Sequence, residues 1–332
     1  MDAALPSVAK SLVADGRGVF AADASPKTLG KRAFEIGLSL DAPAARLAYR
    51  AMTLAMAGLG QYIGGVILHE EALSLIPQLV QQNILPGVKV DQGTGEMTPG
   101  SVEKVTQGLE GLADRLQTFR NLGAKFTKWR AVITIGVQTP TVANITKNAS
   151  DLAQFAKLSQ RAGLVPIVEP EVLMDGNHTL ERCQEVTKQV GQAVFIQLEK
   201  HQVDMAAMLY KPNMAVAGKD CPQQPSLAEV AAQTVQVMKS FVPTHLPGIV
   251  FLSGGQEAIL ATLRLNEIAQ VGTGAPWRWS FSFERALEGP AMQVWRGKTE
   301  YAAAAQKVLL HRARVNSLAS LGHYNEGVEH EV

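Results

Sequence analysis

The sequence predicts an α/β fold, a (β/α)8 TIM barrel that occupies residues 1–332 as one domain. Eight short apolar runs alternate with longer amphipathic segments, which is typical of parallel strands joined by helices. The runs recur at regular spacing with no composition break or Gly/Ser linker, which favours one barrel over two domains. A chain of 332 residues, of which 46% are hydrophobic, can bury the core of such a barrel. The alternative arrangement is an open, doubly wound sheet.

The predicted strands are short runs of apolar residues, and the predicted helices are longer segments whose apolar residues follow helical spacing. Strands are expected at residues 18–23, 63–69, 87–91, 125–135, 165–169, 207–211, 248–253 and 279–283. Helices are expected at residues 101–122, 148–162, 180–202, 226–242, 256–269, 290–297 and 298–320. The polar residues 322–332 show no periodicity, so we expect them to form a mobile tail.

Composition argues against several classes of partner. The 31 basic and 30 acidic side chains give a formal net charge of +1, so no global field favours nucleic acid or a membrane surface. The two cysteines, Cys183 and Cys221, fit free thiols in a reducing compartment, and no Cys/His zinc pattern accompanies them. No secretory signal opens the sequence, and no stretch approaches the length of a membrane-spanning helix. We therefore expect a cytoplasmic enzyme without a metal site.

Ionisable and polar residues stand at seven of the eight predicted strand ends. They are Asp23, Lys89, Lys128 with Arg130, Glu169 with Glu171, Lys211, Ser253 and Arg285. Because the carboxyl ends of barrel strands form the mouth of the active site, this pattern predicts a shared polar cavity. Residues two apart on a strand point to the same face, so Lys128, Arg130, Glu169 and Glu171 are all expected to face inward. Pro170 cannot donate to a ladder, which predicts that Glu171 lies just past the regular strand.

Lys211 is the candidate nucleophile. It ends an apolar run that Pro212 stops. Burying an unpaired ammonium is costly, so a sheltered lysine favours its neutral amine, which can attack a ketone and form a Schiff base. For a lysine taken alone, the simpler interpretation is a strand-end side chain that reaches solvent by its flexible stem.

Taken in order, the strand-end segments resemble the class I fructose-bisphosphate aldolases. The matching strings are Ala-Ala-Asp23, Gly-Val-Lys89-Val-Asp, Lys128-Trp-Arg130, Ile-Val-Glu169-Pro-Glu171, Leu-Tyr-Lys211-Pro-Asn-Met, Phe-Leu-Ser253-Gly-Gly-Gln and Ser-Phe-Ser282-Phe-Glu-Arg285-Ala-Leu. The resemblance covers nearly the whole chain. It implies an enzyme that needs neither metal nor cofactor and reversibly cleaves fructose 1,6-bisphosphate to dihydroxyacetone phosphate and glyceraldehyde 3-phosphate. It also implies a homotetramer.

The resemblance assigns chemical roles by position. Lys211 matches the Schiff-base lysine, and Lys128 would help to keep it neutral by like-charge repulsion. Glu169 matches the general acid/base that handles the carbinolamine hydroxyl, and Glu171 matches the neighbour that tunes charge in the same pocket. Asp23 matches the residue near the C4 hydroxyl whose deprotonation drives cleavage of the C3–C4 bond.

Two groups of residues match phosphate and sugar contacts. The group expected at the C1 phosphate is Ser253, Gly254, Gly255 and Arg285. The group expected near the other phosphate or the sugar hydroxyls is Lys89, Arg130, Ser25, Lys31 and Arg32. The alternative for Lys31 and Arg32 is a solvated helix face.

Three departures from the family pattern affect what can be carried over. Glu284 stands where many relatives have glycine, and its carboxylate either repels phosphate or points away and leaves the backbone amide available. Ala24 replaces a common glutamate. The sequence ends at Val332 without the terminal tyrosine of the animal enzymes, and Tyr324 aligns upstream of that end. We therefore expect another group to transfer the proton, or a slower step after carbon–carbon cleavage.

Competing functions remain at this stage. One is an aldolase for another ketose phosphate, such as fructose 1-phosphate or sedoheptulose 1,7-bisphosphate. Another is a barrel that binds partners without chemistry, against which the intact set of Lys211, Glu169, Lys128 and Asp23 argues. A metal-dependent aldolase is the weakest alternative because its histidine ligand pattern is missing.

Overall fold

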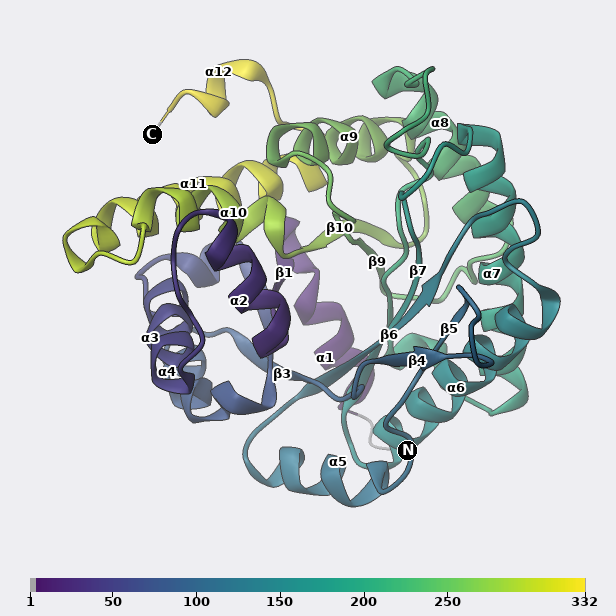
Figure 1. The fold of residues 1–332 in the computed structure, drawn as a ribbon, viewed down its shortest axis with the longest axis horizontal. Coiled ribbons are helices and arrows are strands. Elements are labelled where there is room, and N and C mark those ends of the chain that lie inside the picture. The colour runs from purple at the N-terminus through teal and green to yellow at the C-terminus, as the bar shows by residue number, and fades with distance from the viewer. Residues whose placement is uncertain (1–3, 332) are drawn as a thin grey trace.

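A computed structural model describes residues 4–331 of the chain. Within that range, eight parallel strands close into a barrel in the order β1-β10-β9-β8-β7-β6-β3-β2 (Figure 1). The strands are β1 (Gly18–Ala22), β2 (Ile63–Leu68), β3 (Leu85–Lys89), β6 (Phe126–Ile133), β7 (Val165–Val172), β8 (Leu209–Tyr210), β9 (Gly248–Phe251) and β10 (Arg278–Phe283). The predicted (β/α)8 barrel is confirmed, and the open sheet is excluded.

Helices surround the barrel and connect its strands (Figure 1). They are α1 (Leu5–Leu12), α2 (Pro26–Glu35), α3 (Pro43–Leu54), α4 (Ile76–Gln81), α5 (Leu112–Asn121), α6 (Val142–Arg161), α7 (Leu180–Lys200), α8 (Leu227–Lys239), α9 (Ala258–Val271), α10 (Arg285–Trp295), α11 (Ala302–Ser320) and α12 (Glu326–Glu329). Hydroxyl caps begin several of them. Thr141 caps α6, Thr179 caps α7, and Ser226 forms a capping box with Glu229 at α8, which satisfies backbone amides that the first turn leaves free.

Within residues 4–331, the buried apolar residues form three clusters, of which the first two build the barrel and the third packs helices α2 and α3 together. A large cluster fills the space between the strands and the outer helices. A smaller cluster lies inside the barrel, where Leu5, Ala9 and Leu12 of α1 pack against strand residues such as Phe126 and Ile167. Because α1 and these side chains fill one end of the barrel, polar groups are confined to the other end.

Three predicted helices differ from the structure, and one of them, expected at residues 148–162, begins six residues earlier at Val142. Residues 101–122 were expected to be one helix, but they contain β5 (Lys104–Thr106), which pairs with β4 (Thr94–Glu96) in an antiparallel hairpin. Gly108 and Gly111 then adopt positive φ angles of 116° and 63°, so the helix α5 begins only at Leu112. The helix expected at residues 290–297 begins earlier, at Arg285, and Pro290 lies inside it.

The expected position of Glu171 just past its strand is wrong. Strand β7 runs through Pro170 to Val172. The carbonyl of Val168 accepts from the backbone N–H of Lys211, and the N–H of Val172 donates to the side chain of Asn213, so the even-numbered residues face β8. Because β8 has already ended at Tyr210, Pro170 faces a position where no ladder bond is lost.

The segment expected to be a mobile tail has partners on the body of the protein. Up to Glu331 it contains the short helix α12, and Glu329 pairs with Arg312 of α11. Tyr324 is buried, and its hydroxyl donates to Glu329 at 2.8 Å. These contacts differ from what a mobile tail predicts.

The interior of the barrel has no room for a larger residue at Gly87. A Cβ atom built there would lie 2.2 Å from the ring of Phe126. We expect Gly87→Ala to lower the free energy of unfolding by about 1–3 kcal/mol because the buried ring must shift. Gly289→Ala is the matched control. Its Cβ would meet no atom within 4 Å in helix α10, so stability should hold or rise slightly. Urea denaturation of both variants checks this, and equal stabilities would contradict it.

Candidate active site

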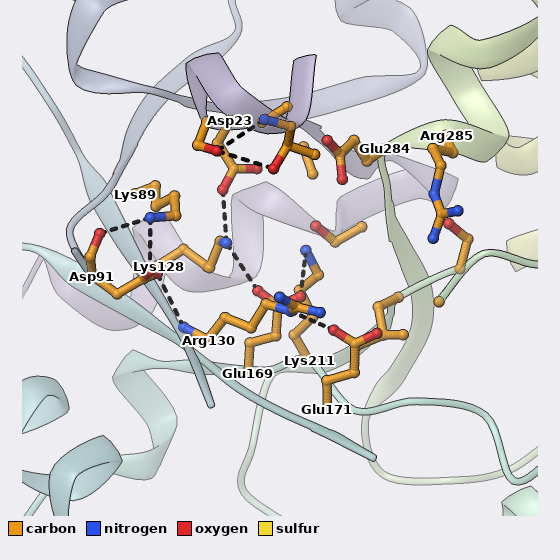
Figure 2. A pocket seen from close by; sticks show the side chains of 18 of the residues that line it. Asp23, Lys89, Asp91, Lys128, Arg130, Glu169, Glu171, Lys211, Glu284 and Arg285 are labelled. Atoms are coloured by element: carbon orange, nitrogen blue, oxygen red, sulfur yellow. Dashed lines mark hydrogen bonds and ion pairs between the residues drawn. The ribbon is translucent and has the colours of Figure 1, made fainter. Parts of the chain in front are cut away.

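A pocket of about 250 Å³ opens at the carboxyl ends of the barrel strands. Figure 2 shows charged side chains from several strands converging there. The predicted site residues that line it are Asp23, Ser25, Arg32, Lys89, Lys128, Arg130, Glu169, Glu171, Lys211, Ser253, Gly254 and Arg285. Lys31 is exposed and does not line the pocket, which fits a solvated helix face. Gly255 lies in the adjoining groove, next to Arg285.

A continuous chain of opposite charges crosses the floor of the pocket. Asp23, at the end of β1, lies 2.7 Å from the ammonium of Lys128 on β6. Lys128 lies 3.1 Å from Glu169 on β7, and the other oxygen of Glu169 lies 3.1 Å from the ammonium of Lys211. All four side chains are buried. Such a chain is stable in a low-dielectric interior only because each charge has a partner.

The charges of this chain fix its protonation. Burial opposes ionisation of Asp23, but the ammonium groups of Lys128 and Lys211 outweigh burial and lower the pKa of Asp23 to about 2. Burial likewise opposes ionisation of Glu169, and the same two lysines lower its pKa. The carboxylates of Asp23 and Glu169 raise the pKa of Lys128 despite burial. Because Lys128 is neutralised by two carboxylates and Lys211 faces Glu169, the like-charge repulsion expected between the lysines is offset.

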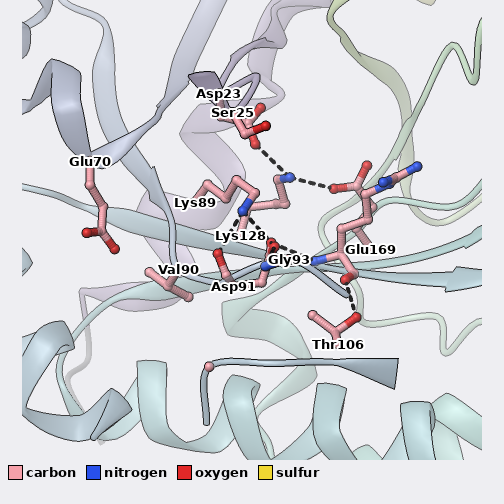
Figure 3. A network of polar contacts seen from close by, with 12 residues as sticks. Asp23, Ser25, Glu70, Lys89, Val90, Asp91, Gly93, Thr106, Lys128 and Glu169 are labelled. Carbon is pink, nitrogen blue, oxygen red and sulfur yellow. Dashed lines mark hydrogen bonds and ion pairs between the residues drawn. The ribbon is translucent and has the colours of Figure 1, made fainter. Parts of the chain in front are cut away.

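A second set of pairs borders this chain (Figure 3). The ammonium of Lys89 lies 2.7 Å from a carboxylate oxygen of Asp91, whose other oxygen accepts from the backbone N–H of Arg130 at 3.3 Å. The guanidinium of Arg130 pairs with Glu171. Asp91 was not among the predicted site residues. Its position two residues beyond Lys89, on the same face of the chain, was the signal that could have found it.

Other lining residues were also not predicted. Thr28, on the first turn of α2, and Ser282, on β10, both border the pocket. The hydroxyl oxygen of Ser282 is buried and has no hydrogen-bond partner among the described residues, so it is available to a ligand. The signals that could have found Ser282 were the strand period that places it on one face with Ser280 and its place in the string that resembles the family.

The Ser253-Gly254-Gly255 turn has the shape of an anion-binding loop. Gly254 and Gly255 adopt positive φ angles of 59° and 95°, which favour glycine. A Cβ atom on Gly255 would lie 2.7 Å from the guanidinium of Arg285. The turn therefore brings together a hydroxyl, a guanidinium and backbone N–H groups that a ligand can approach closely. These are the groups that bind a phosphate.

Glu284 lines the pocket beside Arg285, and its carboxylate is paired. It binds Arg32 of α2, with one Nη2 to Oε2 distance of 3.3 Å. Behind this pair lies the buried Glu288, which accepts from the hydroxyl of Tyr49 at 3.2 Å. Burial and the nearby charge of Glu284 raise the pKa of Glu288 to about 7. Of the two possibilities left open by the sequence, Glu284 does not point away from the pocket, and Arg32 neutralises it.

Within residues 4–331, no cluster of three or more His, Cys, Asp or Glu side chains could hold a metal ion. In the same range, no helix is long and apolar enough to cross a membrane. Cys183 and Cys221 are both free and buried.

The site contains a buried lysine among ionised carboxylates, and it lies at the polar mouth of a parallel barrel. This arrangement is typical of barrel enzymes that use a lysine as the nucleophile. The family profile described as fructose-bisphosphate aldolase class-I matches residues 4–332, and the chain belongs to this family. It is 44% identical over 331 residues to fructose-bisphosphate aldolase of Dictyostelium discoideum, covering 96% of this chain and 92% of that protein. It is 42% identical over 327 residues to the probable class 1 enzyme of Xanthomonas campestris, covering 96% and 97%.

A solved structure of fructose-bisphosphate aldolase from Plasmodium falciparum, in complex with TRAP and a small-molecule inhibitor, superimposes with a TM-score of 0.95. Its sequence is 41% identical, and the match covers 97% of this chain and 95% of that one. The fold and family given by the sequence resemblance are therefore confirmed.

The raised pKa of Glu288 has a consequence for stability. The folded state holds the proton of Glu288 more tightly than the unfolded chain, where a glutamate ionises near pH 4.5. Its contribution to stability is therefore fully present below pH 4.5 and is lost as the pH rises to about 7. We expect Glu288→Gln, whose amide oxygen can still accept from Tyr49, to gain up to ~3 kcal/mol relative to the parent between pH 5 and pH 8.

Free energies of unfolding measured in urea at several pH values check this. Glu110→Gln is the control, because Glu110 is exposed and should leave the pH profile of the parent unchanged. A Glu288→Gln profile parallel to that of the parent would contradict the assignment.

Proposed function

We propose that this chain catalyses the reversible cleavage of fructose 1,6-bisphosphate to dihydroxyacetone phosphate and glyceraldehyde 3-phosphate, a reaction of glycolysis and gluconeogenesis. The chemistry proceeds through a Schiff base on Lys211. The observation that carries the proposal is the buried ammonium of Lys211, 3.1 Å from a Glu169 that also contacts Lys128, at the floor of a polar barrel mouth. Family membership supports the same reaction.

The roles follow from the contacts. Glu169, within reach of the Lys211 nitrogen, takes a proton from the ammonium, and the resulting neutral amine attacks the C2 carbonyl to give a carbinolamine. Glu169 then gives this proton to the carbinolamine hydroxyl, so that water leaves and an iminium forms. Asp23 then removes the proton of the C4 hydroxyl, the C3–C4 bond breaks, and its electron pair moves into the iminium to give an enamine. Glyceraldehyde 3-phosphate departs, and C3 of the enamine gains one proton, which balances the proton that Asp23 removed. Water then adds to the iminium and releases dihydroxyacetone phosphate, leaving the Lys211 ammonium.

The surrounding charges support this sequence of steps. A carboxylate with a pKa of about 2, as in Asp23, is ionised at neutral pH but is a weak base. Removal of the hydroxyl proton is therefore driven by the flow of electrons into the iminium rather than by basicity. Lys128, between Asp23 and Glu169, holds both carboxylates in place. Glu171, paired with Arg130, lines the same pocket as Lys211 and supplies a fixed negative charge there.

The phosphate sites are assigned from the hydrogen-bond donors that line the pocket and the adjoining groove. We assign the phosphate on C1 to Arg285, Ser253 and the glycine turn Gly254-Gly255. We assign the other phosphate and the sugar hydroxyls to the remaining donors of the pocket, which are Lys89, Arg130, Arg32 and Ser25. Lys31, exposed outside the pocket, receives no role in binding.

The proposal predicts a covalent adduct on Lys211. Incubation with dihydroxyacetone phosphate followed by borohydride reduction should attach the three-carbon phosphate to Lys211, located by mass spectrometry of the digest. Lys211→Met should abolish the adduct and lower kcat by at least about 10³-fold. Lys200→Met, at an exposed helix end, is the control and should retain both. A folded protein with no adduct on Lys211 would shift the weight to a barrel that binds without chemistry, and loss of activity with a chelator would favour a metal-dependent enzyme.

We also propose that the chain assembles as a homotetramer in the cytoplasm. Val102, Val137 and Val142 are exposed apolar side chains, and Glu103 binds Thr141 across the same region, so they can contribute to one buried contact between subunits. The two free thiols support a reducing compartment. Light scattering should give four times the 35.6 kDa chain mass, and Val137→Asp with Val142→Asp should lower it. A monomeric parent protein would contradict the assembly.

A further inference from the structure

Among residues 4–331, six cationic side chains and five carboxylates line the pocket. Lys89 pairs with Asp91, Lys128 and Lys211 share Glu169, Lys128 also pairs with Asp23, Arg130 pairs with Glu171, and Arg32 pairs with Glu284. Arg285 is the one pocket cation in this range without a carboxylate within 4.0 Å. The pocket is therefore nearly neutral before any substrate enters.

This balance constrains how a substrate with two phosphates can bind. One phosphate can take the free guanidinium of Arg285 without breaking an existing pair. A second phosphate needs a cation that is already paired, so one carboxylate must give up its partner. The structure indicates which pair opens most readily.

Among the pocket pairs of residues 4–331, the Arg32–Glu284 pair is the one in which both partners are partly exposed. Its side chains are 21% and 26% exposed, whereas each other pair has at least one partner that is 8% exposed or less. Partly exposed ion pairs are weak because water competes for both partners. Neither partner belongs to a barrel strand, since Arg32 lies on α2 and Glu284 precedes α10.

A second carboxylate keeps Arg32 in place when this pair opens. An oxygen of the buried Glu288 lies 4.0 Å from Nη1 of Arg32. Glu288 accepts from the hydroxyl of Tyr49, so its carboxyl oxygens stay beside Arg32 when Glu284 leaves. Glu284, on the solvent side of the guanidinium, is the carboxylate that an incoming phosphate can displace.

We propose that Glu284 is a specificity-determining residue that competes with a phosphate of a sugar bisphosphate for Arg32 and so weakens binding of that substrate. The inference rests on the proposed function for the identity of the substrate. Glu284 takes no part in proton transfer or in bond cleavage. Glu284 weakens the affinity for substrates that carry two phosphates, and it leaves the affinity for substrates with one phosphate unchanged.

Substitution of Glu284 tests the proposal by separating KM from kcat. For Glu284→Gln we expect a KM for fructose 1,6-bisphosphate three- to tenfold lower than that of the parent, with kcat changed less than twofold. The KM for fructose 1-phosphate, whose phosphate binds at Arg285, should change less than twofold. A KM for the bisphosphate that is unchanged or higher would overturn the proposal, the higher value because Glu284 would then be positioning Arg32 for phosphate.

The matched control removes the same charge without touching the ion pair. Glu35 lies on the same helix as Arg32, borders the adjoining groove and is exposed. If Glu35→Gln lowers the KM for the bisphosphate as much as Glu284→Gln does, general electrostatics explain the effect and the proposal fails. Thermal unfolding of both variants, with Glu284→Ala as a second substitution, establishes that they are folded.

Calorimetry separates this inference from the proposed function. Binding of fructose 1,6-bisphosphate to Lys211→Met is measured with and without Glu284→Gln, and it requires no turnover. If the parent protein fails to cleave the sugar, the proposed function fails, and the calorimetric comparison still decides the role of Glu284. Tighter binding by three- to tenfold in the double variant supports the inference, and equal binding overturns it.

Discussion

The chain of charges from Asp23 through Lys128 and Glu169 to Lys211 is the constraint on which the rest of the site depends. Four ionisable groups are buried together, and an unpaired member would be costly to bury. Strands β1, β6 and β7 and the end of β8 each supply one member, so the barrel must close in register for the pairs to form. The same geometry that satisfies these charges puts an amine, an acid/base and a second carboxylate around one small volume.

The barrel tolerates this polar floor because its other end is filled with apolar side chains. Helix α1 and the ring of Phe126 occupy the interior below the pocket, and glycines at 65 and 87 leave space for that ring. Water is excluded from beneath, so the charges of the pocket interact in a low-dielectric surrounding. The division into an apolar half and a polar half is therefore part of the catalytic design and not only of stability.

Much of the fold and of the site could be predicted from the sequence because both follow local rules. Buried parallel strands are continuous apolar runs, and their charged ends mark the mouth of the barrel, which is why Asp23, Lys128, Glu169 and Lys211 were found. The hairpin of β4 and β5 was missed because each strand has three residues and Val105 is their one apolar side chain, so neither shows the period of a strand. Pro170 fits inside strand β7 because the neighbouring strand β8 ends early, at Tyr210. The length of a neighbouring strand cannot be read from the residues around Pro170.

The pairing of Arg32 with Glu284 could not be predicted, because these residues are 252 positions apart and nothing local links them. The same holds for Glu288, whose burial against Tyr49 depends on how α10 packs on α3. Comparison with the family pattern showed that residue 284 is a glutamate where many relatives have glycine. Only the three-dimensional arrangement shows that Arg32 neutralises this glutamate.

The junction between β10 and α10 consists of one residue. Strand β10 ends at Phe283 and helix α10 begins at Arg285, so Glu284 alone joins them. Helix α10 in turn packs extensively against α11. An insertion at this corner would displace both helices, whereas a side-chain replacement would not. At this corner of the barrel, ligand preference can therefore change by substitution of single residues. At corners with a long loop, it can also change when the loop is lengthened or rebuilt.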